Sequence, residues 1–175
     1  MTDDTRETLL SLPIGAPLSG PGAGPQADLP AVFARLIEVH AADRVGGEGI
    51  EAWSKASGHR VLVLAGDPVR HPEGLDVAVV LPEVRRQSAI PFVIGLASRT
   101  DQDAIAQRFG VTSWPNLVFL RDGDYLGALP GMLDWEPFCA EVARLLAGPA
   151  RRPPTVGIPV VAAGPAGSAE GAGCR

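Results

Sequence analysis

The sequence predicts an α/β fold, with a mixed central sheet flanked by helices and a C-terminal β-hairpin and helix. Two observations lead to this prediction. Apolar runs of strand length alternate with segments of helical periodicity, and an Asp-Gly pair separates two strand-like runs near the C-terminal end. The chain has 175 residues, of which 46% are hydrophobic, so it can build one core of ordinary size.

Glycine and proline mark the expected domain boundaries. The chain holds 21 glycines and 17 prolines, and they are concentrated near both ends. Segments of this composition cannot bury enough apolar surface to offset their backbone entropy. We therefore expect a flexible N-terminal segment over 1–27, a folded domain over 28–147, and a disordered tail rich in proline, glycine and alanine over 148–175.

The first predicted elements are a helix and a buried strand. Asp28 and Pro30 are typical of a helix start, where an N-cap acid is followed by a proline whose missing N–H costs nothing. Apolar side chains follow at helical spacing up to His40, and Gly46-Gly47 should end the helix. The continuous apolar run over 60–65 then predicts a strand covered on both faces.

The segment 73–88 is ambiguous. Residues 77–81 have strand propensity, whereas Pro82 and the charged residues after it favour a helix. We prefer a helix over 74–87 that is kinked at Pro82. It would join the strand at 60–65 to a second buried strand at 91–97 as a right-handed crossover.

The C-terminal half gives clearer signals. Thr100 and Asp103 resemble a capping box for a short helix that ends at Gly110. Asp122-Gly123 tolerates the positive φ angles of a type I′ turn, which predicts a hairpin of strands 116–121 and 124–129. Asp134 should cap a last helix with one apolar side, formed by Phe138, Val142, Leu145 and Leu146.

Composition excludes several classes of function. The formal net charge of −5 argues against nucleic acid as a partner. No run approaches the roughly 18 apolar residues of a membrane span, and the acidic N-terminus MTDDTRETLL is unlike a secretory signal. We therefore expect a soluble cytoplasmic protein.

Cysteine and histidine usage predicts no metal site and no cofactor. Cys139 and Cys174 are too far apart for a CxxC pair and too few for a four-cysteine zinc site. The three histidines show no ligand spacing. We expect Cys139 to be a small buried hydrophobe and Cys174 to have no role.

The order of elements and the stretch 109–127, FGVTSWPNLVFLRDGDYLG, resemble thioredoxins. Pro115 falls at the cis-proline position of that fold, and Trp114 precedes it. In thioredoxins a kinking proline follows the catalytic CxxC, and counting back from Pro82 places Gly-Leu-Asp-Val, residues 74–77, where the CxxC would be. Dithiol exchange needs a thiolate and a resolving thiol, so we expect no thiol–disulfide oxidoreductase activity.

A narrower resemblance covers about 29–147. Its motifs are Gly-Asp-Pro at 66–68, Pro-Glu at 72–73, the run 76–83, Trp-Pro at 114–115 and Gly-Met-Leu-Asp-Trp at 131–135. Together they resemble the HupG/HyaE family of hydrogenase expression proteins, also called HoxO. The resemblance implies a non-catalytic maturation chaperone for uptake [NiFe] hydrogenase. Such a chaperone would bind the hydrogenase small subunit and its twin-arginine signal peptide before export, with other maturation proteins as further candidate partners.

A twin-arginine peptide defines what its binding site should contain. Guanidinium groups pair with carboxylates in a forked geometry, and the signal peptide also has an apolar segment. The candidate residues are four acids and the apolar pair at the cis-proline position: Asp67, Glu73, Asp76, Glu83, Trp114 and Pro115. Trp114 could also contact arginine through a cation–π interaction.

Each candidate has a structural alternative. The acids could be solvated caps and loop residues, Trp114 could pack on the hairpin, and Trp135 could fasten the last helix to the sheet. Two other functions stay open. One is a general interaction module in another complex, and the other is an enzyme on this scaffold, although 74–77 supplies no ordinary nucleophile.

Overall fold

The computed structural model describes residues 29–154, and its helices and strands lie between Ala31 and Leu146. Its centre is a five-stranded sheet in the order β1-β3-β2-β4-β5. The strands are β1 Asp43–Val45, β2 His59–Leu64, β3 Phe92–Ala97, β4 Asn116–Arg121 and β5 Asp124–Pro130. β3 runs parallel to β1 and β2, whereas β4 is antiparallel to β2 and β5. This is the mixed, thioredoxin-like sheet that the sequence predicts.

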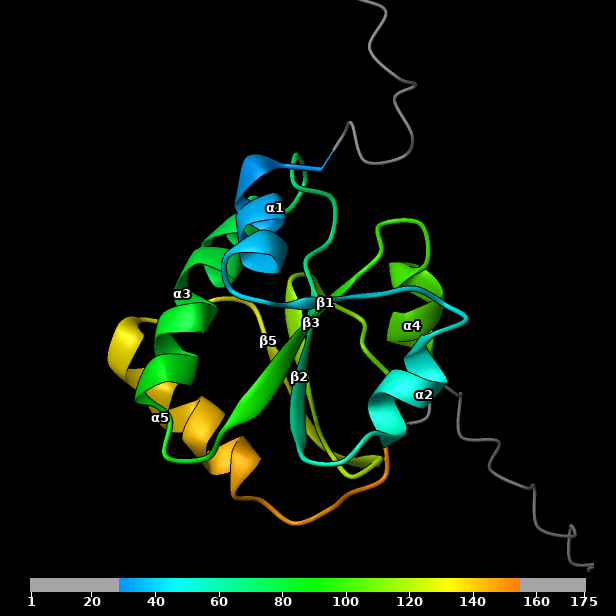
Figure 1. The fold of residues 1–175 in the computed structure, drawn as a ribbon, viewed down its shortest axis with the longest axis vertical. Helices are drawn as coiled ribbons and strands as arrows, with labels where there is room; N and C mark the ends of the chain where they lie inside the picture. The colour runs from blue at the N-terminus through cyan, green and yellow to red at the C-terminus, as the bar shows by residue number, and fades with distance from the viewer. Residues whose placement is uncertain (1–28, 155–175) are drawn as a thin grey trace, which may run out of the picture. The chain divides into compact units, whose positions relative to one another are not determined.

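Helices cover both faces of the sheet (Figure 1). α1 Ala31–Glu38, α3 Glu73–Gln87 and α5 Trp135–Leu146 lie on one side, and α2 Ile50–Lys55 and α4 Gln102–Arg108 lie on the other. The core between the sheet and the second pair includes Ile50, Ile105, Leu64 and Val118. The apolar side of α5 is buried as predicted, with Phe138 fully inaccessible.

The ambiguous segment 73–88 is one helix, α3, with Pro82 inside it. Its buried side includes Val77, Ala78 and Leu81, the residues whose strand propensity created the ambiguity. α3 provides the connection between the parallel strands β2 and β3. The helix and its place between two parallel strands are therefore confirmed, while the kink at Pro82 stays a prediction.

The hairpin is also confirmed. Asp122 and Gly123 have φ angles of 53° and 94°, the positive values that a type I′ turn requires. The Asp122 carboxylate accepts a hydrogen bond from the Gly58 N–H at 2.8 Å, so the turn is also attached to the segment that precedes β2.

Two predictions about the first half of the chain are wrong. The first helix ends at Glu38, not at Gly46-Gly47, because Ala41 reverses the chain with a φ of 50°. The intervening β1 and α2 are absent from the sequence prediction. β1 has three residues, of which only Val45 is buried, and α2 has six, so neither is long enough to show a period.

The predicted capping box of α4 does not form. The N-cap residue is Asp101, which makes no side-chain bond to its own helix. The Asp101 carboxylate instead accepts hydrogen bonds from the Gly47 N–H at 2.9 Å and the Ser98 hydroxyl at 3.0 Å, which lowers the pKa of Asp101. The hydroxyl groups of Thr100 and Ser98 form a hydrogen bond of 2.8 Å. A long-range tether therefore replaces the local cap.

The described backbone continues beyond 147, where we expected the domain to end. The Arg151 N–H donates to the Tyr125 carbonyl at 2.7 Å, forming an isolated bridge to β5. Pro154 lies against Gly110, where an added Cβ would be 2.1 Å from the Pro154 carbonyl oxygen. The stretch 148–154 therefore contacts β5 and the turn that follows α4. The predicted flexible segment 1–27 and the rest of the predicted tail, with Cys174, lie outside the described residues.

Candidate functional site

The loop between β2 and α3 is held by Asp67. One oxygen of its carboxylate accepts the N–H groups of Val69 at 2.8 Å and Arg70 at 3.2 Å. The other accepts the Arg99 guanidinium at 2.5 Å. The hydrogen bond from the Val69 N–H is the main cause of the lowered pKa of Asp67, and the contacts with Arg70 and Arg99 lower it further. This carboxylate is therefore already engaged in ordering its own loop.

The same loop lies against the residues at the cis-proline position. A Cβ added at Gly66 would be 2.9 Å from the ring of His71 and 3.0 Å from the Cβ of Trp114. The Gly66 N–H donates to the buried amide oxygen of Gln102 at 3.0 Å. Trp114 is half-buried against the core, and the Trp114–Pro115 peptide bond is cis. The structure therefore brings Asp67, Trp114 and Pro115 to one end of the sheet.

The first turn of α3 begins beside the same loop. A Cβ added at Gly74 would be 2.4 Å from the carbonyl oxygen of Ala65, so the helix lies directly on the end of β2. Glu73 and Asp76 are exposed in this turn, where the helix dipole favours negative charge. Within residues 29–154 neither carboxylate takes part in an ion pair. These two acids are available to a ligand in a way that Asp67 is not.

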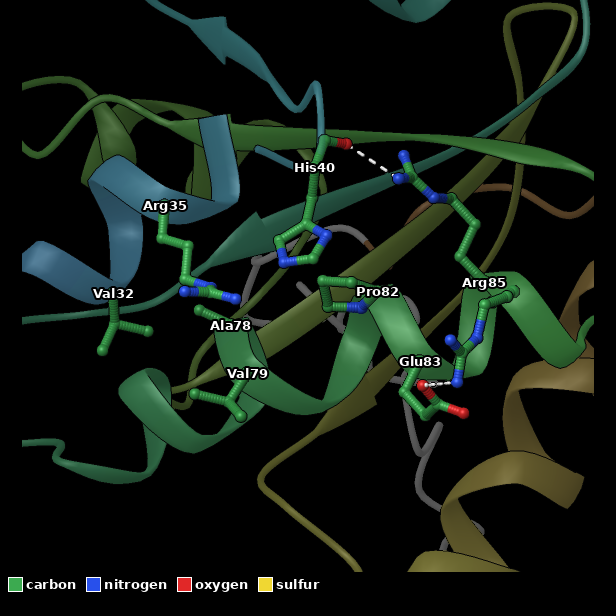
Figure 2. A pocket seen from close by; sticks show the side chains of 9 residues that line it. Val32, Arg35, His40, Ala78, Val79, Pro82, Glu83 and Arg85 are labelled. Atoms are coloured by element: carbon green, nitrogen blue, oxygen red, sulfur yellow. Dashed lines mark hydrogen bonds and ion pairs between the residues drawn. The ribbon is translucent and has the colours of Figure 1, made fainter. Parts of the chain in front are cut away.

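Glu83 does not join this group. It lies about two helical turns beyond Asp76, where it accepts hydrogen bonds from Arg86 at 2.5 Å and Gln87 at 2.6 Å. These hydrogen bonds lower the pKa of Glu83, and the bond from Arg86 has the largest effect. Its carboxylate faces a pocket between α1 and α3 (Figure 2). The structure thus separates Glu83 from the other acids that we predicted would act with it.

The structure adds apolar residues that sequence reasoning missed. The loop from β5 to α5 starts at Gly131, whose N–H donates to the Pro115 carbonyl at 2.8 Å. This loop leads to Leu133 and Trp135, which are 40% and 42% exposed. Trp135 is the first residue of α5 and is only partly covered, whereas Phe138, nearly one turn later, is fully buried. Phe138 is therefore the residue that anchors this turn of α5 in the core, and the part predicted for Trp135 in fastening the helix stays a prediction.

No sequence signal separates Trp135 from Phe138. Both carry large apolar side chains at helical spacing, and only the position of the helix start relative to the sheet distinguishes them. The pattern Gly-Met-Leu-Asp-Trp over 131–135 is the one local hint, because it places apolar residues in a loop.

The described part of the chain holds one free cysteine, Cys139, and no cluster of metal ligands. No group of three or more His, Cys, Asp or Glu residues within 29–154 could hold a metal ion. Cys139 is partly exposed, not buried as predicted, and lines a second cavity of about 550 Å³ between α3 and α5. Over the same residues, no helix combines the length and the apolar composition that a bilayer crossing requires.

The cis-proline end combines exposed acids with exposed apolar side chains. Exposed carboxylates on α3 and exposed apolar side chains on the β5–α5 loop border the same end of the sheet. Carboxylates pair with guanidinium groups, and exposed apolar patches mark interaction surfaces. We call the set Glu73, Asp76, Trp114, Leu133 and Trp135 the cis-proline surface.

Comparisons with known proteins agree with the motifs of the sequence. Residues 32–138 match the family model described as hydrogenase-1 expression protein HyaE. The hydrogenase expression/formation protein HoxO of Cupriavidus necator is 49% identical over 142 residues, which are 80% of this chain and 88% of HoxO. HupG of Bradyrhizobium diazoefficiens, which carries the same description, is 37% identical over 128 residues, covering 72% of this chain and 84% of HupG.

A solved structure shares part of this sequence. The crystal structure of a hydrogenase expression/formation protein HupG from Rhodopseudomonas palustris is 30% identical. The match covers 60% of this chain and 95% of that one, with a TM-score of 0.43. The family model spans more than half of the chain, and the similarity to HoxO extends over most of both proteins. The chain therefore belongs to the HyaE family of hydrogenase expression proteins.

Proposed function

We propose that this protein is a non-catalytic maturation chaperone for an uptake [NiFe] hydrogenase. It binds the hydrogenase small subunit through the twin-arginine signal peptide, on the cytoplasmic side and before export. The names of its relatives, hydrogenase expression/formation proteins, support a role in hydrogenase maturation. The observation that carries the binding proposal is the cis-proline surface, where exposed acids and exposed apolar side chains occur at one end of the sheet.

The two parts of the cis-proline surface match the two parts of a twin-arginine peptide. Glu73 and Asp76 receive the guanidinium groups, because neither carboxylate has an ion-pair partner within 29–154. Trp114, Leu133 and Trp135 receive the apolar segment. An exposed ion pair contributes about 0.2–1 kcal/mol, so the apolar contacts must supply much of the affinity.

Position 74 supports a binding role over a redox role. In the thioredoxin arrangement it is the first position of the CxxC motif, and here the backbone of Ala65 leaves no space for a Cβ. Residues 74–77 hold no cysteine, serine or threonine. These residues support an accessory role without covalent chemistry.

The test is calorimetric titration of the full chain with a synthetic twin-arginine signal peptide. The double variant Glu73→Gln/Asp76→Asn should weaken binding about tenfold, which corresponds to about 1.4 kcal/mol. The matched control Glu38→Gln/Asp103→Asn removes two exposed acids from α1 and α4 and should bind as the parent does.

A second variant examines the apolar part. Trp135→Ala should weaken the same peptide at least as much and should leave a peptide lacking the apolar segment unaffected. Equal affinity of both double variants, together with unchanged binding by Trp135→Ala, would remove the cis-proline surface from the proposed function. Failure of the small subunit to co-purify with the full chain would contradict the chaperone role itself.

A further inference from the structure

A pocket of about 620 Å³ lies between α1 and α3 (Figure 2). Its size is within the range of ligand pockets. Apolar side chains of Val32, Ala78, Val79 and Pro82 contribute to its lining. Val79 is 63% exposed, which is a large fraction for a valine in the middle of a long helix. Val79, together with the half-buried Val32, therefore offers apolar surface above the buried Ala78 and Pro82.

The rim of this pocket is basic. Arg35 comes from α1, and Arg85 and Arg86 come from α3, against the single carboxylate of Glu83. Figure 2 shows the Arg35 guanidinium directed into the pocket, with the ring of His40 near it. We call these lining residues the α1–α3 groove. Its positive charge contrasts with the whole chain, which has a net charge of −5.

The arginines of the groove differ in the hydrogen bonds and ion pairs that they make with the rest of the domain. Arg85 donates to the main-chain carbonyl of His40 at 2.7 Å, so it joins α3 to the segment after α1. Arg86 pairs with Glu83 at 2.5 Å, but its side chain is 75% exposed. Arg35 makes no ion pair within residues 29–154. Arg35 and Arg86 can therefore be changed without removing a structural contact between elements.

We infer that the α1–α3 groove binds an acidic segment of a partner protein that also carries apolar side chains. Charge complementarity selects the acidic residues, because guanidinium groups bind carboxylates in forked pairs. The apolar lining selects a polypeptide over a bare anion, since an inorganic ion gains nothing from Val79 or the half-buried Val32. The net negative charge of the chain disfavours nucleic acid. This groove has the opposite charge preference to the cis-proline surface, so it takes a different segment.

The inference can be tested by amide NMR on the full isotope-labelled chain. The probe is a short synthetic peptide of glutamate, leucine and alanine, and its counterpart has glutamine in place of every glutamate. The acidic peptide should shift the amides of α1 and of residues 78–86, and raising the salt concentration should weaken the binding. The glutamine peptide should bind at least tenfold more weakly.

Substitutions then identify which side chains of the groove contact the acidic peptide. Arg35→Gln/Arg86→Gln should weaken the acidic peptide about tenfold, and Val79→Ser should weaken it without changing its dependence on salt. The control Arg144→Gln removes an exposed arginine of α5 that pairs with Glu141 of its own helix, and it should have no effect. The twin-arginine peptide should bind all these variants as it binds the parent, so this test is independent of the proposed function.

Four results would overturn the inference. They are equal binding of the glutamine peptide, an equal loss in Arg144→Gln, the same amide shifts with inorganic phosphate alone, and no binding of the acidic peptide to the full chain. If removal of residues 1–27 restored binding in the last case, the acidic N-terminal sequence of the chain itself would be the occupant.

Discussion

Substitution of Gly74 by alanine measures how tightly α3 lies on the end of β2. In an unconstrained helix interior this change stabilises a protein by about 0.5–1 kcal/mol. Here the new Cβ would be 2.4 Å from the Ala65 carbonyl oxygen and 3.1 Å from its carbon, and these are backbone atoms that cannot rotate away. Overpacking of this kind costs about 1–3 kcal/mol. We therefore expect a net loss of about 1–2 kcal/mol.

The assay is urea denaturation followed by far-ultraviolet circular dichroism, with an unchanged slope expected for both proteins. The control is Gly47→Ala, where the added Cβ would be 3.5 Å from the Asp101 carboxylate carbon, an ordinary contact. The control should change the free energy of unfolding by less than about 0.5 kcal/mol. A Gly74→Ala protein as stable as the parent, or more stable, would refute the close approach of α3 to β2 and with it the steric exclusion of a cysteine there.

Three further outcomes follow from the structure. Phe138→Ala should cost about 3–5 kcal/mol in the free energy of unfolding because its side chain is fully buried, whereas Trp135→Ala should cost far less in the same denaturation experiment. Asp67→Asn should destabilise the protein near neutral pH. The pKa of Asp67 is below its ordinary value of 3.8 in the folded state. The difference in the free energy of unfolding between the parent and Asp67→Asn should therefore have its full size above about pH 5. It should shrink as the pH falls below 3.8 through the folded-state pKa, as shown by urea midpoints across this pH range. Gly95→Ala should displace Trp53, because its Cβ would be 2.5 Å from the indole ring, and the indole N–H resonance should shift.

The second half of the fold could be predicted because its signals are local. Asp122-Gly123 defines the hairpin by backbone chemistry alone. The segment 73–88 needed a second criterion, since its apolar residues fit either a strand or a helix. The preference for a helix rested on Pro82 and the charged residues after it, and on topology, because two buried parallel strands require a crossover. The missing elements depend on contacts with other elements. β1 pairs with β3, which places Val45 opposite Ala97, and the Trp53 indole of α2 donates to Asp43 of β1 at 2.8 Å. No local pattern reveals either contact.

The candidate site could be predicted only in part for a related reason. The motif at 114–115 and the count from Pro82 located the cis-proline end correctly in the chain. The role of each acid depended on neighbours that are distant in sequence. Asp67 is engaged by Arg99, which lies 32 residues away, and Glu83 lies near α1 across the groove. Exposure of Trp135 depends on where α5 begins relative to the sheet, which periodicity alone does not define.

The charges of α3 do not by themselves demonstrate either proposed surface. Its first turn carries Glu73 and Asp76, and its last turn carries Arg85 and Arg86, the arrangement that complements a helix dipole. Stability could therefore account for all four charges. It does not account for the exposed apolar residue Val79, nor for Leu133 and Trp135 beyond the helix, because an exposed apolar side chain contributes little to folding. The apolar substitutions therefore separate binding from stability more sharply than the charge substitutions. A surface substitution usually changes stability by less than about 0.5 kcal/mol, whereas loss of a docked apolar side chain reduces affinity directly.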